Sequence, residues 1–138
     1  MSDKINIFLD DVRGLHQMYY MSERYLFINH EFKIIRSVQE FKTYIDSIDL
    51  SKLNIISFDH DLTTEHYKDL KLNLCSTGTG GECLLYLIKK LKDNKIDNSN
   101  IYIVLHSQNG HAIDMMSSIC QRENLNILGM TPKNSRYY

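Results

Sequence analysis

The residues best suited to chemistry in this sequence are two short acidic clusters, each directly after an apolar run. The run 5–9 leads into DDVR at 10–13, and the run 55–58 leads into DHDL at 59–62. Clustered carboxylates repel each other unless a cation or shared protons offset their charge. The pattern therefore predicts a metal-dependent phosphate site with Mg²⁺ or Mn²⁺ as the cofactor. The expected metal ligands are Asp10, Asp11 and Asp59.

Two histidines follow apolar runs in the same way, His60 after the run 55–58 and His106 after the run 101–105. Imidazoles beside a phosphate site can act as general base and general acid, or can orient the phosphate. We expect both to be catalytic, with Asp61 either supporting His60 or capping the loop. The alternative for each histidine is a purely structural role.

Arg13 is the expected phosphate-binding cation, because a guanidinium can hold a phosphate through two parallel hydrogen bonds. The alternative is an ion pair with Asp11 or Asp61. Ser107 and Asn109 lie where a strand leads into a helix, and backbone N–H groups at such a junction favour an anion. The alternative for Ser107 and Asn109 is that they only cap the helix.

The elements that must position these residues alternate between strands and helices along the chain, as in a parallel sheet with right-handed crossovers. We expect an α/β fold with a single doubly wound, flavodoxin-like sheet of order 2-1-3-4-5, whose switch point lies between the first and third strands. Those two strands end in the acidic clusters. The expected strands are 4–9, 32–36, 54–58, 101–105 and 126–130.

Three helices are expected between these strands. They begin after Ser37, after Thr79 and at about Gly110, and Thr79 with Glu82 has the spacing of a capping box. The connection 14–31 is rich in aromatic residues, so it either covers the site or packs as a short helix. The segment 63–75 is polar and irregular.

Length and composition fit one globular domain, residues 1–138, with a mass of 16.2 kDa. A net charge of −1 disfavours general duplex nucleic-acid binding, although a homo-oligomer is compatible with it. The three cysteines have no zinc-like spacing. Since no signal segment or membrane span is evident, we expect a cytoplasmic protein without membrane contact.

Four motifs in fixed order carry a resemblance over about residues 5–116: LDDVR, FDHDL, TGGECLLYL and HSQNGHAIDMM. They resemble the cyclic-phosphate processing receiver domain family, a divergent branch of the response-regulator receiver fold. The resemblance implies a receiver-like sheet and a role in handling cyclic phosphates, in RNA repair or in phage–host conflict. It assigns the site to Asp10, Asp11, Arg13, Asp59, His60, Asp61, Thr79, Gly80, His106, Ser107, Asn109, Ala112 and Met116.

The chain departs from the family pattern in three places. The connection 13–31 is longer and more aromatic than expected, and Met115 stands where asparagine is frequent. Ordinary receivers place a lysine after the fifth strand, where this chain has Thr131, Pro132 and Lys133.

The combined expectation is a metal-dependent phosphodiesterase that opens a cyclic phosphate, either an RNA 2′,3′-cyclic phosphate end or a cyclic nucleotide signal. One alternative is a non-catalytic module that sequesters a cyclic nucleotide. The other is a receiver-like interaction domain in which Asp59 accepts a phosphoryl group. The sequence leaves the nucleobase, the cyclic linkage and the metal open.

Overall fold

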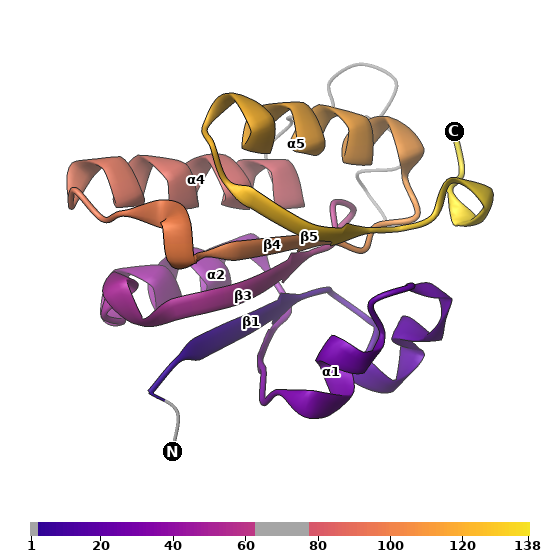
Figure 1. The fold of residues 1–138 in the computed structure, drawn as a ribbon, viewed down its shortest axis with the longest axis horizontal. Coiled ribbons are helices and arrows are strands. Elements are labelled where there is room, and N and C mark those ends of the chain that lie inside the picture. Colours follow the sequence, from indigo (N-terminus) through magenta and orange to yellow (C-terminus); the bar gives the residue numbers. More distant parts are fainter. Residues whose placement is uncertain (1–2, 63–77) are drawn as a thin grey trace.

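A computed structural model describes residues 3–62 and 78–138 of the chain. At its centre lies a five-stranded sheet in which every neighbouring pair is parallel, with the order β2-β1-β3-β4-β5 (Figure 1). This confirms the predicted fold class and strand order. The strands are β1 (Ile5–Leu9), β2 (Lys33–Ile35), β3 (Leu53–Phe58), β4 (Tyr102–Leu105) and β5 (Asn126–Met130).

Helices cover both faces of the sheet, as the doubly wound arrangement requires (Figure 1). One face carries α2 (Val38–Ser47), α4 (Gly80–Asp93) and α5 (Gly110–Arg122). The opposite face carries the 3-10 helix η1 (Leu15–Tyr20) and α1 (Tyr25–Asn29). In the described ranges, the 3-10 turns η2 (Leu50–Lys52) and η3 (Asn98–Asn100) lie between larger elements, and η4 (Lys133–Ser135) follows β5.

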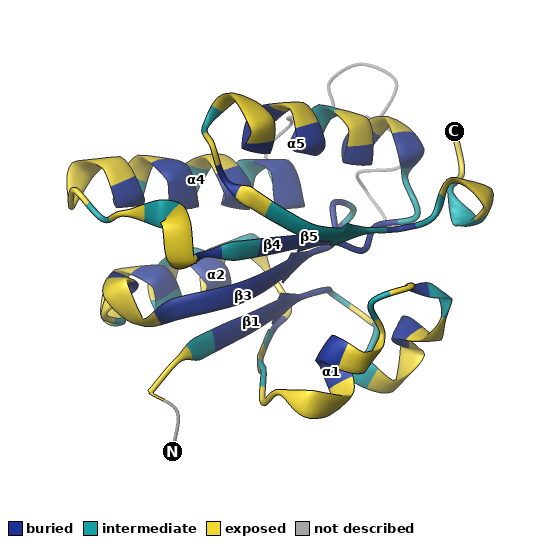
Figure 2. Ribbon diagram, in the orientation of Figure 1, coloured by how far each residue is buried: buried dark blue, intermediate teal, exposed yellow. Residues whose placement is uncertain are grey.

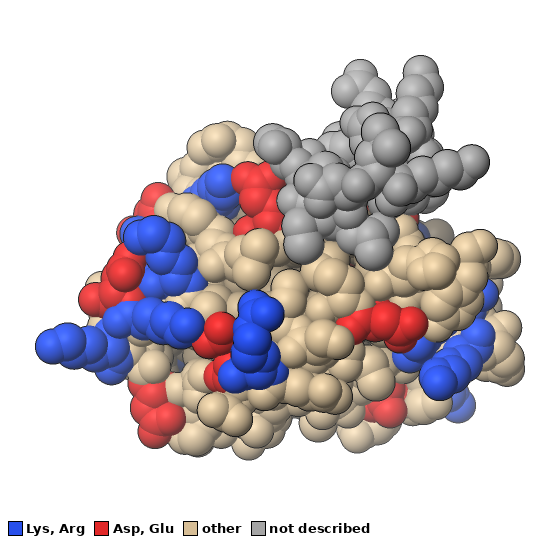
Figure 3. Space-filling view, turned by 90° about the horizontal axis from the view of Figure 1, so that it is seen from above, with Lys and Arg blue, Asp and Glu red and all other residues tan. Residues whose placement is uncertain are grey.

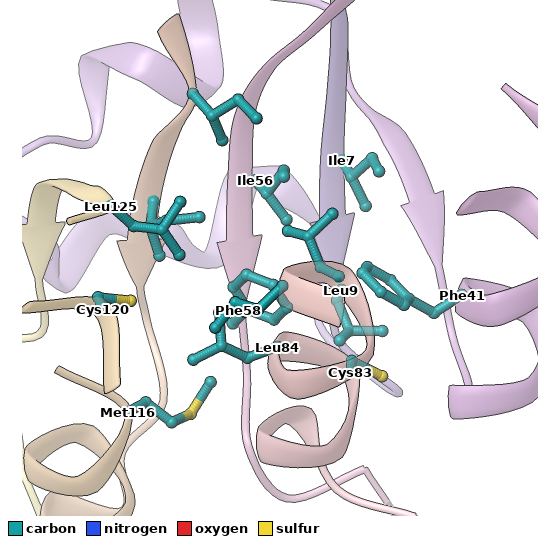
Figure 4. Close-up of a cluster of buried hydrophobic side chains, with 14 of the residues drawn as sticks. Ile7, Leu9, Phe41, Ile56, Phe58, Cys83, Leu84, Met116, Cys120 and Leu125 are labelled. Carbon is teal, nitrogen blue, oxygen red and sulfur yellow. The ribbon is translucent and has the colours of Figure 1, made fainter. Parts of the chain in front are cut away.

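The larger core lies between the sheet and the helices α2, α4 and α5. Alternate strand residues such as Ile7 and Leu9 point to this side, because successive side chains of a strand face opposite ways. They meet buried side chains of the helices, among them Phe41 and Leu84 (Figure 4). Each of these helices is buried on one side only, whereas β3 is buried throughout (Figure 2).

The aromatic connection 14–31 forms the second core. Phe8 points to this side of the sheet and meets the edge of the Phe27 ring at a centroid distance of 5.7 Å. Met18 and Met21 are buried beside it. The connection thus packs as short helices on the sheet. The last residue of η1, Tyr20, lies near the carboxyl ends of the strands.

Side-chain caps begin the three longer helices near the predicted positions. Ser37, Thr79 and Asn109 each accept a hydrogen bond from a backbone amide of the first turn. The capping box is only half realised, because the Glu82 carboxylate accepts from the Gly78 amide at 2.5 Å. The glutamate therefore ties the residue before the cap to the helix.

Cys83 and Cys120 are buried with free thiols, as expected of small core residues, and Cys75 lies outside the described residues. No helix in the described ranges is long and apolar enough to cross a membrane. On the visible part of the face over α4 and α5, acidic and basic side chains lie interspersed (Figure 3). The irregular segment predicted at 63–75 also falls outside the described residues.

Candidate functional site

Asp10 and Asp59 stand side by side because the strands that carry them are neighbours. Leu9 of β1 is in register with Phe58 of β3, and the Asp59 amide donates to the Leu9 carbonyl at 2.9 Å. Both aspartates are buried, with 0% and 3% of their surface exposed. Two carboxylates buried side by side lose their hydration and repel each other, so nearby positive charge or hydrogen bonds must offset this cost.

The Arg13 guanidinium supplies much of that compensation. Its Nε lies 3.1 Å from Asp10 Oδ2, and its Nη2 lies 3.5 Å from Asp59 Oδ1. The backbone brings Arg13 into place, because Asp10 Oδ1 accepts from the amides of Val12 at 3.0 Å and Arg13 at 2.8 Å. With 21% of its side chain exposed, Arg13 forms the outer part of the cluster.

The two carboxylates differ in their protonation. Burial and the neighbouring Asp10 raise the pKa of Asp59 well above its usual value, against the opposing effect of Arg13. Burial also acts to raise the pKa of Asp10, but hydrogen bonds from His106 and from two backbone amides outweigh it and lower this pKa. Asp10 is therefore the ionised partner and forms the stronger ion pair with Arg13.

His106 lies beneath Asp10 and is fully buried. Its Nε2 is 3.0 Å from Asp10 Oδ2, its Nδ1 is 2.7 Å from Ser57 Oγ, and its ring stacks on Phe8 at a centroid distance of 4.7 Å. Burial lowers the pKa of His106, although the Asp10 carboxylate opposes this. The neutral imidazole fits both contacts, with Nε2–H donating to Asp10 and Nδ1 accepting from the Ser57 hydroxyl.

His60 and Asp61 form a second pair next to this cluster. His60 Nδ1 lies 3.0 Å from Asp61 Oδ1, and the His60 amide donates to Asp59 Oδ1 at 2.9 Å. Asn109 Nδ2 reaches the Asp61 carboxylate at 3.4 Å. This arrangement matches the expectation that Asp61 supports His60, and it links the end of β3 to the start of α5.

The predicted anion-binding junction after β4 is largely occupied by the protein itself. Ser107 Oγ accepts from the Asn109 amide at 3.0 Å, and the Gly110 amide donates to the Tyr137 carbonyl at 2.9 Å. Asn109 caps α5. Asn109 is thus the helix cap, Ser107 accepts from the amide of that cap, and Thr79 caps α4. Phosphate binding by Ser107, Asn109 and Thr79 stays a prediction.

The end of β5 carries a hydroxyl where ordinary receivers place a lysine. Thr131 is buried, and its hydroxyl lies 2.7 Å from the Ser107 carbonyl and 3.3 Å from that of Leu105. Lys133 is exposed in the following turn η4. The cation that contacts the two aspartates therefore comes from the loop after β1.

Within the described part of the chain, Asp10, Asp59 and His106 form a group of side chains that could hold a metal ion. One ligand atom from each lies within 4.8 Å of the other two. Carboxylate oxygens with an imidazole nitrogen suit a divalent ion such as Mn²⁺, whereas Mg²⁺ prefers oxygen alone. Asp11 stands outside this group and is half-buried, and burial together with Asp10 raises its pKa.

Three contributors to the site escaped prediction from the sequence. Tyr20 Oη accepts from Arg13 Nη1 at 2.7 Å, Ser57 holds His106, and Arg36 Nη1 reaches the carbonyls of Asp10 at 3.0 Å and Arg13 at 2.5 Å. Ser57 was detectable as the one polar residue in the apolar run 55–58. Tyr20 belongs to the aromatic connection that was expected to cover the site or pack as a helix, but its contact with Arg13 was not predicted. Arg36 carried no signal, because only the folded chain brings it near Arg13.

Comparison with known families supports the resemblance seen in the sequence. The family model described as the cyclic-phosphate processing Receiver domain matches residues 5–122, which include every residue of the cluster just described. The comparisons with curated proteins and with solved structures found no match. Because this match covers most of the chain, the chain belongs to the cyclic-phosphate processing Receiver domain family.

Proposed function

We propose that this protein is a phosphodiesterase that opens a cyclic phosphate, either an RNA 2′,3′-cyclic phosphate end or a cyclic nucleotide. The observation that carries the proposal is the convergence of Asp10, Asp59 and Arg13, where a partly exposed guanidinium contacts two buried carboxylates. A guanidinium in this position is suited to a phosphate group, because it offers a planar array of donors.

The reaction requires one bond to form and one to break at phosphorus. The oxygen of a water molecule attacks phosphorus, the ring P–O bond breaks, and the released alkoxide takes up a proton to give a phosphate monoester. Arg13 would stabilise the negative charge that develops on the phosphoryl oxygens. Its contacts with Asp10 and Asp59 hold the guanidinium at the site.

We assign the proton transfers to His60 and the support of the site to His106. His60 is oriented by Asp61, the arrangement that fixes a catalytic imidazole in many enzymes. His106 is as fully buried as His60, but both of its ring nitrogens are engaged, by Asp10 and by Ser57. It therefore acts on Asp10 and not on the substrate.

A divalent metal, Mn²⁺ or Mg²⁺, is part of the proposal. Asp10 and Asp59 would hold it, with Asp11 or His106 as a further ligand. Its chemistry would be to polarise the phosphoryl oxygens and lower the pKa of a bound water. Because Arg13 already contacts both carboxylates, the guanidinium must share them or shift its contacts when the ion binds.

A turnover assay over a small substrate panel tests this function. The protein is incubated with 2′,3′-cyclic and 3′,5′-cyclic nucleotides and with an RNA ending in a 2′,3′-cyclic phosphate, in EDTA, Mg²⁺ or Mn²⁺. We expect a phosphate monoester from one substrate class, dependent on metal and lost in Asp59→Asn. Asp93→Asn, an exposed aspartate of α4, is the matched control and should keep full activity.

A second function, sequestering a cyclic nucleotide without turnover, is favoured by one observation. The histidine closest to the two carboxylates, His106, is buried and bonded at both nitrogens, as in a rigid binding site. The same assay separates the two functions when affinity is measured beside it. Tight binding of a cyclic phosphate that is recovered unchanged in every metal condition would establish sequestration.

A further inference from the structure

We propose that Tyr20 is a positioning residue that fixes the plane of the Arg13 guanidinium at the mouth of the site. The inference rests on the proposed role of Arg13 as the phosphate-binding group. Tyr20 comes from the end of η1, on the face of the sheet opposite α4 and α5, and it is absent from the motifs that carry the family resemblance.

The first support is the set of partners around the guanidinium. Each of its nitrogens has a defined contact: Nε with Asp10, Nη2 with Asp59, and Nη1 with Tyr20 Oη at 2.7 Å. Two of the three partners are carboxylates on one side of the group. The phenol of Tyr20 contacts the guanidinium from another direction. Three contacts from different directions fix the plane of the group, whereas the two carboxylates alone would leave it free to tilt.

The second support is the direction of the hydrogen bonds at the phenol. A tyrosine hydroxyl has one proton to donate, and Tyr20 donates it to the backbone carbonyl of His106. The oxygen lone pairs therefore face Arg13, which can only donate. Burial raises the pKa of Tyr20, so the hydroxyl keeps its proton at neutral pH.

The third support is that the Tyr20 ring is itself held. It packs against the buried cluster around Phe8, and Tyr19 meets it edge-on at a centroid distance of 6.2 Å. Tyr20 thus connects Arg13 of the loop after β1 to the end of β4. The neighbouring Tyr19 is 77% exposed, which makes it a matched control.

The test compares Tyr20→Phe with Tyr19→Phe in protein carrying ¹⁵N-labelled arginine. In the wild type, we expect separate, slowly exchanging Nη signals for Arg13, assigned by their loss in Arg13→Lys. Tyr20→Phe should merge these signals, because rotation about the Nε–Cζ bond becomes faster, while Tyr19→Phe leaves them unchanged. Unchanged Arg13 signals in folded Tyr20→Phe would overturn the proposal.

Affinity for 2′,3′-cyclic AMP in EDTA gives the second readout. Tyr20→Phe should weaken binding about tenfold in the wild-type background, the scale of one lost hydrogen bond, and have little effect in Arg13→Lys. An equal loss in both backgrounds would mean that Tyr20 acts independently of Arg13 and would overturn the proposal. Altered Arg13 signals in a protein that binds no cyclic phosphate would uphold the positioning role and refute the proposed function.

Discussion

At the scale of single residues, the site consists of charged and polar side chains that follow one another from the surface inwards. Arg13 lies outermost, Asp10 and Asp59 lie beneath it, and His106 lies below Asp10. Because the pKa of Asp10 is lowered while that of Asp59 is raised, the Arg13 guanidinium is balanced mainly by the Asp10 carboxylate. This balance explains how so many polar groups can be buried together.

Substitutions of His60 and His106 are expected to have different effects. His60→Gln should lower kcat by about 10²–10⁴-fold with little change in affinity, as expected for loss of a general acid or base. His106→Gln should instead lower the free energy of unfolding by roughly 1–3 kcal/mol, because Asp10 and Ser57 lose their buried partner. Turnover, binding and urea unfolding measured for each variant separate these effects.

His111→Gln is the control for both variants, because His111 lies on α5 against Tyr138 and outside the cluster. It should match the wild type in turnover and binding. A His60→Gln variant with wild-type kcat would remove His60 from the mechanism.

The raised pKa of Asp59 predicts how stability depends on pH in EDTA. Below the unfolded pKa, near 3.8, Asp59 is protonated in both states, so its stabilising contribution is complete. As the pH rises towards the higher folded pKa, only the unfolded state releases the proton, and this contribution is lost. The stability advantage of Asp59→Asn over the wild type should therefore grow with rising pH, as measured by urea unfolding between pH 4 and pH 8.

A constant difference between the two proteins over that range would contradict the shifted pKa of Asp59. Asp93→Asn serves again as the control, since Asp93 pairs with Lys89 on the exposed side of α4. The difference in free energy of unfolding between Asp93→Asn and the wild type should remain small over the same pH range.

Arg13 and a divalent ion should compete for the same carboxylates. Arg13→Gln removes the guanidinium from Asp10 and Asp59, so it should lower stability in EDTA by about 1–3 kcal/mol. The same variant should bind Mn²⁺ at least about tenfold more tightly than the wild type, by calorimetric titration. Equal or weaker Mn²⁺ binding in Arg13→Gln would place the ion away from these two residues.

At the scale of elements, the close approach of α4 to the end of β3 shapes the site. The Gly80 amide donates to the His60 carbonyl at 2.8 Å, and a Cβ at Gly80 would overlap the Asp59 carbonyl. The helix start is thereby held directly against the strand end that carries Asp59 and His60. At Gly81, one residue on, a Cβ would meet the flexible end of Met115 at 3.2 Å and the His60 ring at 3.5 Å, an ordinary contact distance.

These two glycines make a matched pair of substitutions. Gly80→Ala should lower the free energy of unfolding by roughly 2–4 kcal/mol, because backbone must move to admit the methyl group. Gly81→Ala should be close to neutral or slightly stabilising, since alanine is the better helix former. Urea unfolding of both variants checks this, and equal effects would contradict the close approach.

The elements themselves were largely predictable from the sequence, and the physical reason is periodicity. Apolar runs such as 101–105 and caps such as Asn109 depend on local residue patterns, so strand order and helix starts were confirmed. Strand bounds moved by a residue or so, as for β4, which begins at Tyr102. A short helix in the connection 14–31 was one of the two expectations, but the bounds of η1 were not foreseen, because its aromatic residues follow no helical period.

At the site, the sequence predicted the strand-end acids and the basic residue beside them, but not their geometry. It grouped Asp11 with Asp10 by adjacency, whereas the fold brings Asp10 together with Asp59 and His106. It offered no route to Tyr20, whose hydroxyl reaches His106, 86 positions along the chain. Contacts of that kind depend on tertiary packing and leave no local pattern.

At the scale of the whole molecule, topology explains why the site is where it is. The sheet changes winding direction between β1 and β3, so the chain leaves their carboxyl ends towards opposite faces, which is where open α/β sheets commonly bind ligands. η1 and α1 cover one face, and α4 and α5 cover the other (Figure 1). The tail adds to this enclosure, since Tyr137 pairs with the start of α5.

The most direct test of cyclic phosphate hydrolysis at this site is ³¹P NMR of a 2′,3′-cyclic phosphate RNA end incubated with the protein and Mn²⁺ in ¹⁸O-labelled water. We expect loss of the cyclic phosphate signal and growth of a monoester signal carrying one ¹⁸O, with neither change in Arg13→Gln. A 3′,5′-cyclic nucleotide in the same experiment covers the other substrate class. Cyclic phosphate signals that persist for both substrates with wild-type protein would contradict hydrolysis at this site.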